Sequence, residues 1–446
     1  MVDSAVKTST VPLDLAQPLP IVSCDGHIGP RMSDMRTYCP GDRLEQFDEF
    51  AGQIEDMGKA FSALRPEQTL DAPEALVRAA QSTRMRAVEG AHDMQARLRD
   101  MNDDGVVAEL IFHGVQDLRP VPWVGLAGFT LGELVDTDAH ELSLAGMRIY
   151  NRWLADAVSI EPERHIAAAL LPIWDIDLSI TELRWAREAG LKAVNFPSPR
   201  RGLAFYDDPV WEPFWSACED FDMPLVTHAG ALDREDSSSS GIAAPFLQSI
   251  ELGGWPSRRA LARLIFGGVF ERHRALKLLL VEQNHHWWTA TIDEYDSAYL
   301  SNRWMVQDEV PRLPSEYLRD HVFIGASFMA PFEAEAAVDE GYVDNVMWGR
   351  DYPHVEGTWQ PSVGDDPRNM TLCSLRYCYS GIAPEDTRAM LSDNAIRILG
   401  LDRDVLSNVA ERIGSPTLEQ IAAPLGAIPA PGVGGALAFR TRGPWG

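Results

Sequence analysis

Eight short apolar runs, most of them separated by longer amphipathic segments, constrain the fold of this chain more than any other feature. Several runs are apolar almost throughout, which is typical of parallel strands that are buried on both faces. The runs occupy residues 20–24, 106–112, 166–173, 193–196, 225–227, 276–281, 322–326 and 345–348. The helical segments lie at 142–159, 178–189, 211–220, 257–272, 289–305, 331–340 and 384–399. Strands and helices in this alternation predict an α/β fold of the (β/α)8 type, the TIM barrel.

An open, doubly wound sheet is the alternative arrangement for such strands and helices. That fold requires a glycine-rich turn after its first strand, where a dinucleotide binds. Residues 25–29 read Asp-Gly-His-Ile-Gly and match this fingerprint poorly. The barrel is therefore the favoured fold.

The domain organisation follows from length and from shifts in composition. The chain has 446 residues, 45% of them hydrophobic, which is enough for one large domain or two ordinary ones. We expect a flexible lead over residues 1–19 and the barrel over 20–402. A charged, helix-rich stretch at about 32–91 separates the first two strands and predicts a helical insertion. Residues 403–446 are rich in Pro and Gly and predict an extended C-terminal arm over the barrel or a neighbouring subunit.

Charge and cysteine usage exclude several classes of partner. The net charge of −27 repels phosphate backbones, so we expect no nucleic-acid partner. No apolar run approaches the roughly 18 residues of a membrane span, and residues 1–20 lack the pattern of a signal peptide. The five cysteines are odd in number and scattered, which favours a reducing cytoplasm over a disulfide framework. We therefore expect a cytoplasmic protein without a membrane partner.

Imidazoles and carboxylates follow the predicted strands at the points where those strands end. In a TIM barrel, the carboxyl ends of the strands meet at one mouth and carry the chemistry. A mixed set of nitrogen and oxygen donors suits iron, manganese or zinc. The candidate metal ligands are Asp25, His27, His113, His228, Glu282, His285, His286 and Asp351.

Each candidate also has an interpretation without metal. His113 is as well explained as a hydrogen-bonded core histidine, and His228 as a buried structural one. Asp351 fits a helix cap or an ion pair with Arg350. Alternation along an extended strand would place His286, rather than His285, on the side of Glu282, and we prefer it for that reason.

Several motifs between residues 21 and 402 resemble one enzyme family. They are Asp25-Gly26-His27; Ala96-Arg97-Leu98-Arg99-Asp100-Met101 with Asp104-Gly105-Val106; Tyr150-Asn151-Arg152-Trp153; Glu163-Arg164; Pro224-Leu225-Val226-Thr227-His228; Trp348-Gly349-Arg350-Asp351-Tyr352-Pro353-His354 with Glu356-Gly357-Thr358-Trp359; and Asn394. Together they resemble the amidohydrolase-related family that includes aminocarboxymuconate semialdehyde and γ-resorcylate decarboxylases. The resemblance implies a TIM barrel with a divalent metal held by Asp25, His27, His228 and Asp351, and nonoxidative decarboxylation or hydrolysis as the reaction.

The chain departs from this family pattern after its sixth strand. Glu282 and Trp287 keep their places, but residues 284–286 are Asn, His and His where the family has small residues. Arg350 replaces the usual small residue before Asp351, and His113 is also unusual. With these differences, the sequence resembles a branch of TIM-barrel nonheme diiron monooxygenases that are associated with diterpenoid antibiotic biosynthesis.

Four ligands complete one metal site, and Glu282 with His285 or His286, with His113 as a further candidate, would complete a second. Two irons in such a site activate dioxygen. We therefore expect a diiron monooxygenase that hydroxylates an unactivated C–H bond of a small diterpenoid substrate, either free or linked to CoA. Its partners would be dioxygen, an electron donor or reductase, and a second copy of the chain in a homodimer.

The alternative is a mononuclear decarboxylase or hydrolase with a single zinc or manganese ion. In that enzyme the metal holds a carboxylate or a water, and Asp351 or His286 moves the proton. The number and kind of bound metal and the uptake of oxygen distinguish the two hypotheses.

Overall fold

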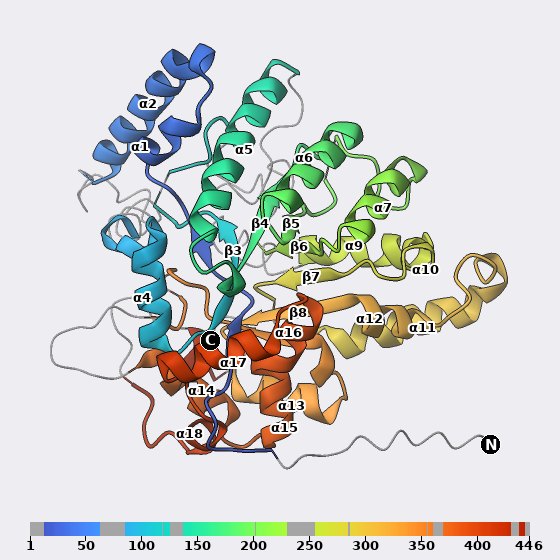
Figure 1. Ribbon diagram of the computed structural model, residues 1–446. Helices are drawn as coiled ribbons and strands as arrows, with labels where there is room; N and C mark the ends of the chain where they lie inside the picture. Colours follow the sequence, from blue (N-terminus) through green and yellow to red (C-terminus); the bar gives the residue numbers. More distant parts are fainter. Residues whose placement is uncertain are drawn as a thin grey trace, which may run out of the picture.

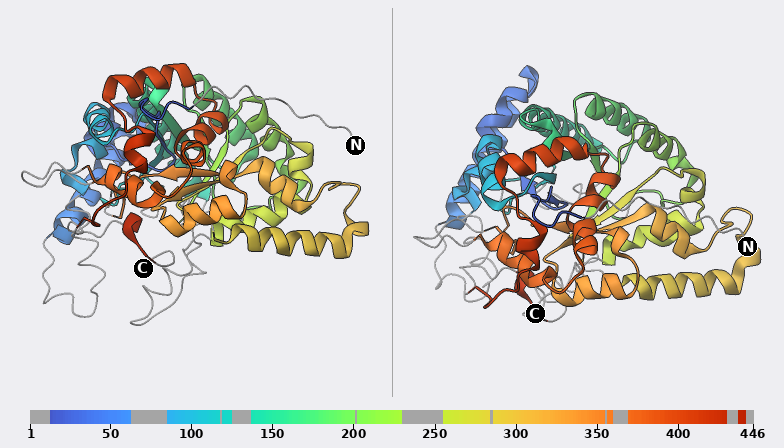
Figure 2. Two further views of the ribbon diagram at one scale, coloured as in Figure 1. Left: turned by 90° about the horizontal axis from the view of Figure 1, so that it is seen from below. Right: turned by 60° about the horizontal axis from the view of Figure 1, so that its bottom comes forward.

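The structure is a computed structural model that describes residues 13–62, 85–117, 119–124, 137–200, 202–229, 255–283, 286–354, 356–359, 369–429 and 437–441. Its strands are β1 (Val22–Ser23), β2 (His27–Ile28), β3 (Ala108–His113), β4 (His165–Leu170), β5 (Ala193–Asn195), β6 (Leu225–His228), β7 (Leu278–Val281), β8 (Val322–Ser327) and β9 (Val346–Gly349). Helices surround the strands as an outer ring (Figures 1 and 2).

The helices of this ring and of the chain ends lie in the intervening segments. The α-helices are α1 (Met32–Met35), α2 (Leu44–Ser62), α4 (Met94–Asp104), α5 (Thr137–Val158), α6 (Ile176–Glu188), α7 (Glu212–Asp220), α9 (Trp255–Phe266), α10 (Val269–Arg272), α11 (Trp288–Asn302), α12 (Pro314–His321), α13 (Pro331–Asp339), α14 (Met370–Tyr379), α15 (Pro384–Arg388), α16 (Asn394–Ile398), α17 (Arg403–Ile413) and α18 (Leu418–Ala422). Short tight turns of helix are η1 (Arg36–Tyr38), η2 (Gly41–Arg43), η4 (Glu89–Ala91), η5 (Pro162–Arg164), η6 (Pro209–Trp211), η8 (Arg303–Met305), η9 (Val343–Asn345) and η11 (Leu437–Phe439), and η10 (Ala389–Asp393) is a π-helical turn.

The strands form one parallel sheet that nearly closes on itself. The order is β1-β3-β4-β5-β6-β7-β8-β9, and β2 also pairs with β3. At the seam between the first and last strands, the Cys24 N–H donates to the Trp348 carbonyl over 2.8 Å, and the Asp351 N–H donates to the Asp25 carbonyl over 3.1 Å. The predicted TIM barrel is thereby confirmed.

The apolar runs fold as barrel strands because both of their faces are buried. In β7, Leu278 and Leu280 pack into the large cluster shared with the surrounding helices. Leu279 and Val281, which alternate with them, belong to a second cluster with residues of the other strands. A strand with apolar residues at every position therefore satisfies an inner and an outer face at once.

The predicted extended arm is wrong over its first part. Residues 403–422 contain α17 and α18, and Leu406 and Val409 of α17 join the inner cluster of the barrel. The spacing of apolar residues in 403–413 is typical of an amphipathic helix. The prediction missed this helix because it treated residues 403–446 as one Pro- and Gly-rich segment. The tail helices thus pack on one end of the barrel rather than trailing over it.

The other flanking segments follow the predicted layout more closely. The described parts of 32–91 are helical, with α1, α2 and η4. Leu19, at the end of the predicted flexible lead, donates its N–H to Pro416 over 3.0 Å, so this part of the lead is held against the tail. The predicted helix 257–272 is divided into α9 and α10 where Gly268 adopts φ 68°. Within the described residues, no helix has the length and apolar character of a membrane span.

Candidate metal centre

Four of the predicted ligands meet at the carboxyl ends of the barrel strands. Asp25 follows β1, His27 begins β2, His228 ends β6, and Asp351 follows β9. Asp25, His27 and Asp351 have no exposed surface, and His228 is 4% exposed. The nearly closed barrel brings together residues at the ends of β1, β6 and β9 and at the start of β2, as the sequence predicts.

The side chains converge on a very small volume. The Nε2 atoms of His27 and His228 each lie 3.3 Å from the same Oδ1 atom of Asp25. His27 Nε2 also lies 3.2 Å from Oδ1 of Asp351. Single donor atoms of Asp25, His27 and His228 lie within 4.8 Å of one another, a spacing that one metal ion can bridge.

Backbone carbonyls fix the orientation of both imidazoles. His27 Nδ1 lies 3.1 Å from the His113 carbonyl oxygen, and His228 Nδ1 lies 2.7 Å from the Ala229 carbonyl oxygen. A carbonyl only accepts hydrogen bonds, so each Nδ1 carries its hydrogen. In the neutral imidazole the Nε2 lone pair then points at a carboxylate, an arrangement that requires positive charge between them.

The carboxylates of Asp25 and Asp351 also favour a positive charge at this point. Ser327 donates its hydroxyl to Oδ2 of Asp25, but Oδ1 of Asp25 accepts no hydrogen bond from the described residues. Oδ2 of Asp351 is also buried without such a bond. Buried carboxylate oxygens normally have hydrogen-bond donors, cations or metals as partners. These atoms fit a divalent cation by geometry and by charge.

His354 also belongs to this cluster, although it was not among the predicted ligands. Its Nδ1 lies 2.9 Å from Oδ1 of Asp351, and its ring stacks on His27 with the ring centroids 4.0 Å apart. A tight turn, in which the His354 N–H donates to the Asp351 carbonyl, brings the side chain back to the site. His27, Asp351 and His354 thus form a second ligand group that shares His27 with the first.

The close approach of carboxylates and imidazoles shifts the pKa values of Asp25, His228 and His354. Burial alone would raise the pKa of Asp25, but His228 and His27 outweigh it and the pKa is lowered. Burial opposes charge on His228, yet Asp25 raises the pKa of this imidazole to about 9. Asp351 likewise raises the pKa of His354 to about 10 against the effect of burial. The cluster therefore stabilises positive charge at its centre, carried either by protons or by a metal ion.

Glu282 lies at the edge of the cluster. Its Oε2 is 3.5 Å from His228 Nδ1, its side chain is 22% exposed, and burial raises its pKa to about 8. Glu282 and Asp351 are both non-glycine residues with positive φ, 55° and 53°. Such backbone is costly for an ordinary residue and is concentrated at functional sites.

His113 borders the cluster through its backbone. Its carbonyl oxygen is the acceptor for His27, while its ring Nδ1 lies 3.1 Å from the Asn195 amide nitrogen. An amide nitrogen only donates, so this Nδ1 is an acceptor already in use. Burial lowers the pKa of His113 to about 3, so the ring is neutral. The possible ligand groups among the described residues do not include His113.

The predicted second metal site is not formed by the described residues. β7 ends at Val281, and the positive φ of Glu282 breaks the alternation that was expected to place His286 beside it. His286 is exposed. Partial burial lowers the pKa of its imidazole, and the positive charges of Arg258 and Arg440 lower it further. His285 lies outside the described residues.

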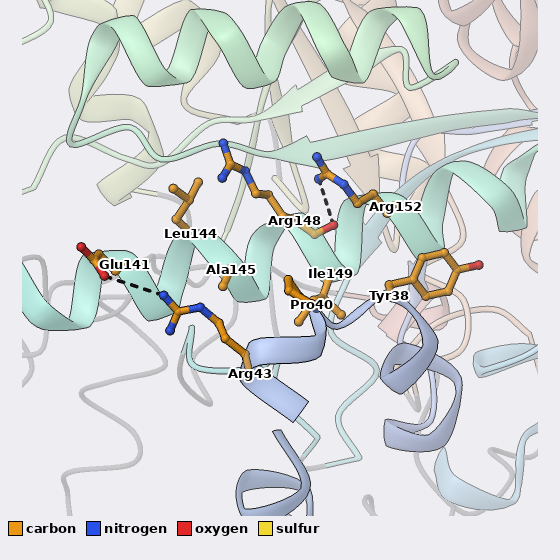
Figure 3. A pocket seen from close by; sticks show the side chains of 9 residues that line it. All are labelled: Tyr38, Pro40, Arg43, Glu141, Leu144, Ala145, Arg148, Ile149 and Arg152. Carbon is orange, nitrogen blue, oxygen red and sulfur yellow. Dashed lines mark hydrogen bonds and ion pairs between the residues drawn. The ribbon is translucent and has the colours of Figure 1, made fainter. Parts of the chain in front are cut away.

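A separate hollow of about 480 Å³ lies between η1, η2 and α5, away from these ligands (Figure 3). Two arginines on its wall form ion pairs. Arg43 Nη2 lies 3.7 Å from Glu141 Oε2, and Arg148 pairs with Glu182. The residues that line it are Tyr38, Pro40, Arg43, Glu141, Leu144, Ala145, Arg148, Ile149 and Arg152. None of them is a candidate ligand.

Comparisons with known proteins place this chain in an enzyme family. Residues 124–401 match the family described as amidohydrolase. The γ-resorcylate decarboxylase of Polaromonas sp. strain JS666 is 27% identical over 196 residues, which cover 42% of this chain and 57% of the relative. The γ-resorcylate decarboxylase of Rhizobium sp. strain MTP-10005 is 24% identical over 273 residues, 56% of this chain and 75% of the relative.

A solved structure shows the same fold. It is 5-carboxyvanillate decarboxylase from Novosphingobium aromaticivorans DSM 12444, complexed with manganese and 4-hydroxy-3-methoxy-5-nitrobenzoic acid. The TM-score is 0.56 at 20% identity, and the match covers 87% of this chain and 97% of the other.

The expectation of a diiron monooxygenase in diterpenoid antibiotic biosynthesis is wrong. The similar proteins are decarboxylases, and the solved relative holds manganese rather than two irons. The prediction rested on histidines 285 and 286, of which the described one is exposed and apart from the cluster. The alternative with one zinc or manganese ion agrees better with the similar proteins.

Proposed function

The chain belongs to the amidohydrolase family, and on that premise we propose that it is a divalent-metal-dependent nonoxidative decarboxylase of a hydroxylated aromatic acid or a related unsaturated acid. The observation that carries the proposal is the buried cluster at the barrel mouth, where the Nε2 atoms of His27 and His228 face one oxygen of Asp25. Oxygen atoms of Asp25 and Asp351 that are buried without a hydrogen bond from the described residues favour a bound cation, and manganese or zinc accepts both carboxylate and imidazole ligands.

The names of the similar proteins support the class of reaction and substrate. Two curated relatives are γ-resorcylate decarboxylases, and a solved relative is 5-carboxyvanillate decarboxylase in complex with manganese. These substrates are aromatic acids, so a hydroxylated benzoate is the first class to test. The alignment covers 57% of the first relative, which makes the substrate of this chain a matter for experiment.

Asp25, His27, His228 and Asp351 would hold the metal, and His354 is a fifth candidate. A bound divalent cation supplies a Lewis acid that neutralises negative charge on a substrate oxygen. Ser327 and the carbonyls that receive the Nδ1 hydrogens of His27 and His228 fix the direction of the ligand atoms. This buried shell also keeps bulk water from the ligands.

Glu282 is the candidate proton donor. In decarboxylation the C–C bond to the carboxylate breaks, its electron pair stays on the substrate carbon, and a proton replaces the departing CO2. Glu282 lies next to His228, and unlike the fully buried ligands it has an exposed part that a substrate can reach. We propose that its carboxyl oxygen delivers this proton.

The test is anaerobic turnover by the purified chain after metal removal and reconstitution with Mn²⁺ or Zn²⁺. We expect CO2 release from γ-resorcylate or 5-carboxyvanillate that depends on added metal and consumes no oxygen. The Asp351→Asn variant is the control, because it keeps the shape of the side chain but loses its charge. Metal-dependent hydrolysis of amides or esters without CO2 release would replace decarboxylation by the hydrolase alternative, and full activity in the metal-free protein would refute the proposal.

A further inference from the structure

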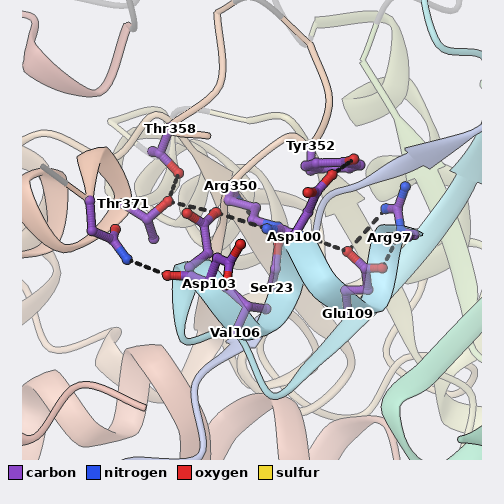
Figure 4. Close-up of polar contacts among 12 residues, drawn as sticks. Ser23, Arg97, Asp100, Asp103, Val106, Glu109, Arg350, Tyr352, Thr358 and Thr371 are labelled. Atoms are coloured by element: carbon purple, nitrogen blue, oxygen red, sulfur yellow. Dashed lines mark hydrogen bonds and ion pairs between the residues drawn. The ribbon is translucent and has the colours of Figure 1, made fainter. Parts of the chain in front are cut away.

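A second buried cluster of charges contacts the candidate metal centre through the backbone of His27. Figure 4 shows Arg97, Glu109 and Arg350 of this cluster. We call it the arginine network, and its members are Arg97 of α4, Arg350 after β9, Glu109 of β3 and Asp104 of α4. Arg97, Arg350 and Glu109 have no exposed surface, and Asp104 is 6% exposed. Burying four charges without solvent is costly unless each is paired, so their arrangement requires an explanation.

Both guanidinium groups of the network share one carboxylate. Arg97 donates to both oxygens of Glu109, and Arg350 Nη2 donates to Glu109 Oε2 over 3.1 Å. Arg350 Nη1 also donates to Asp104 over 2.8 Å. The ring of Tyr352 contacts both arginines, at 4.6 Å from Arg97 and 4.5 Å from Arg350. The network therefore ties α4 and β3 to the segment that follows β9.

The Arg97 side chain also contacts the backbone of a ligand segment, and the backbone N–H of Arg350 contacts the side chain of Ser23. Arg97 donates to the carbonyl oxygen of His27 through Nη1. Arg350 is the residue before Asp351, and its N–H donates to Ser23 Oγ over 3.0 Å. The same Ser23 hydroxyl donates to the carbonyl oxygen of Asp25 over 2.7 Å. Three of the four proposed ligands are thus linked to the network. Arg97 bonds to His27, Arg350 precedes Asp351, and Ser23 connects the backbone of Arg350 to Asp25.

Gly26 shows how closely the network approaches the ligands. A Cβ atom at this position would lie 2.8 Å from Nη2 of Arg97 and 3.2 Å from Oε2 of Glu109. A larger residue between Asp25 and His27 would therefore displace the arginine–glutamate pair, which occupies the space of a side chain. This contact leaves little freedom for the ligand segment to move against the network.

From these contacts we infer that Arg97 and Arg350 are positioning residues of the metal centre. By sharing Glu109, they hold the backbone of residues 25–27 in register with Asp351 across the barrel seam. The inference rests on the proposed function, since it assigns the network to the geometry of that same site. Groups behind metal ligands typically change metal affinity by about 10- to 100-fold when they are removed.

The experiment compares Mn²⁺ binding by Arg350→Met with binding by Arg164→Met. Arg164 is equally buried, but it donates to the carbonyls of Val106 and Val107 and contacts no proposed ligand. Isothermal titration at a temperature where both variants are folded gives the dissociation constants, and the EPR spectrum of bound Mn²⁺ reports the ligand geometry. We expect about 10- to 100-fold weaker binding and an altered spectrum for Arg350→Met, with both unchanged for Arg164→Met.

Two further variants keep the test decisive if Arg350→Met does not fold. Arg97→Lys removes the paired contact to Glu109 that a guanidinium makes, and we expect weaker Mn²⁺ binding with the fold retained. Arg350→Lys keeps the charge but cannot reach both carboxylates, so we expect an intermediate affinity. Wild-type affinity in Arg97→Lys and Arg350→Lys, or equal weakening by Arg164→Met, would overturn the inference.

The wild-type titration separates this inference from the proposed function. If the wild-type chain binds no Mn²⁺ or Zn²⁺, the proposed function itself fails. If the wild-type chain binds metal and the network variants bind it equally well, only the positioning role fails.

Discussion

The candidate metal centre and the arginine network are two buried, charged clusters in contact with each other, and their charges are compensated in different ways. In the network, the charged atoms of Arg97, Arg350, Glu109 and Asp104 have partners, apart from Nε of Arg350 among the described contacts. In the metal centre, buried oxygens of Asp25 and Asp351 have no hydrogen-bond donor there. Charges that satisfy one another stabilise a fold, whereas charges that lack partners indicate a ligand that completes them.

Removing Glu109 is expected to have the largest effect on stability. The Glu109→Gln variant leaves two buried guanidinium groups without their shared anion, which typically costs about 3–5 kcal/mol. Urea denaturation gives the free energy of unfolding. The control is Glu182→Gln: Glu182 is buried, but its partner Arg148 is 40% exposed, so a loss of at most about 1 kcal/mol is expected. Equal losses in the two variants would contradict the distinction between the clusters.

Mn²⁺ is expected to raise the free energy of unfolding by binding at the candidate metal centre and at no other site. Mn²⁺ at about 100 times its dissociation constant should raise the free energy of unfolding of the wild-type chain by about 2.7 kcal/mol. The His228→Gln variant should lose most of this gain, because one of the ligands that binds the ion in the folded state is gone. His321→Gln is the matched control, since His321 is buried against the Leu276 carbonyl, away from the ligands and the arginine network, and should leave the gain intact. Denaturation with Mn²⁺ and with EDTA measures the difference.

Acid is expected to weaken the network within a defined range of pH. Despite burial, which opposes the charge, Arg97 and Arg350 lower the pKa of Glu109 to about 2 from 4.5. A carboxyl whose pKa is lower in the folded protein stabilises it above its unfolded pKa and loses that contribution as pH falls towards the folded pKa.

Between pH 6 and 3.5, Glu109 should therefore lose about 1 kcal/mol of its contribution. The measurement is the stability gap between the wild-type chain and Glu109→Gln at the two pH values. A gap that widens on acidification would refute the assignment of this charge.

Replacing the exposed His286 is expected to have the smallest effect. His286→Ala should change stability by less than about 0.5 kcal/mol and leave the metal content unchanged, because the side chain is exposed and apart from the ligand groups. Elemental analysis and denaturation measure both quantities. A loss of bound metal would contradict the position of this histidine in the structure.

The sequence predicted the barrel because strands buried on both faces leave a strong pattern. It also predicted Asp25, His27, His228 and Asp351 as ligands, and the structure brings these four together, although their binding of metal stays a prediction. Ligands placed at strand ends are foreseeable because the barrel itself determines where strand ends meet.

The sequence failed where a turn replaced a strand. The alternation assumed for Glu282 and His286 requires extended backbone, but Glu282 has φ 55° and β7 has already ended. A turn also explains why His354 was underestimated, since its approach to Asp351 depends on the hydrogen bond between their backbones. Arg350 appeared to be a partner for Asp351, yet it reaches Asp104 and Glu109, which are distant in sequence and adjacent only after folding.

The seam of the barrel has a consequence for the order of events in the life of the chain. The hydrogen bond from Arg350 to Ser23 joins residues 327 positions apart, among the last that a growing chain can bring together. Loops of this length close late in folding. Because the predicted ligands lie on both sides of the seam, the candidate site forms only after Asp351 has reached Asp25 and His27. We therefore expect no high-affinity metal binding before the barrel has closed.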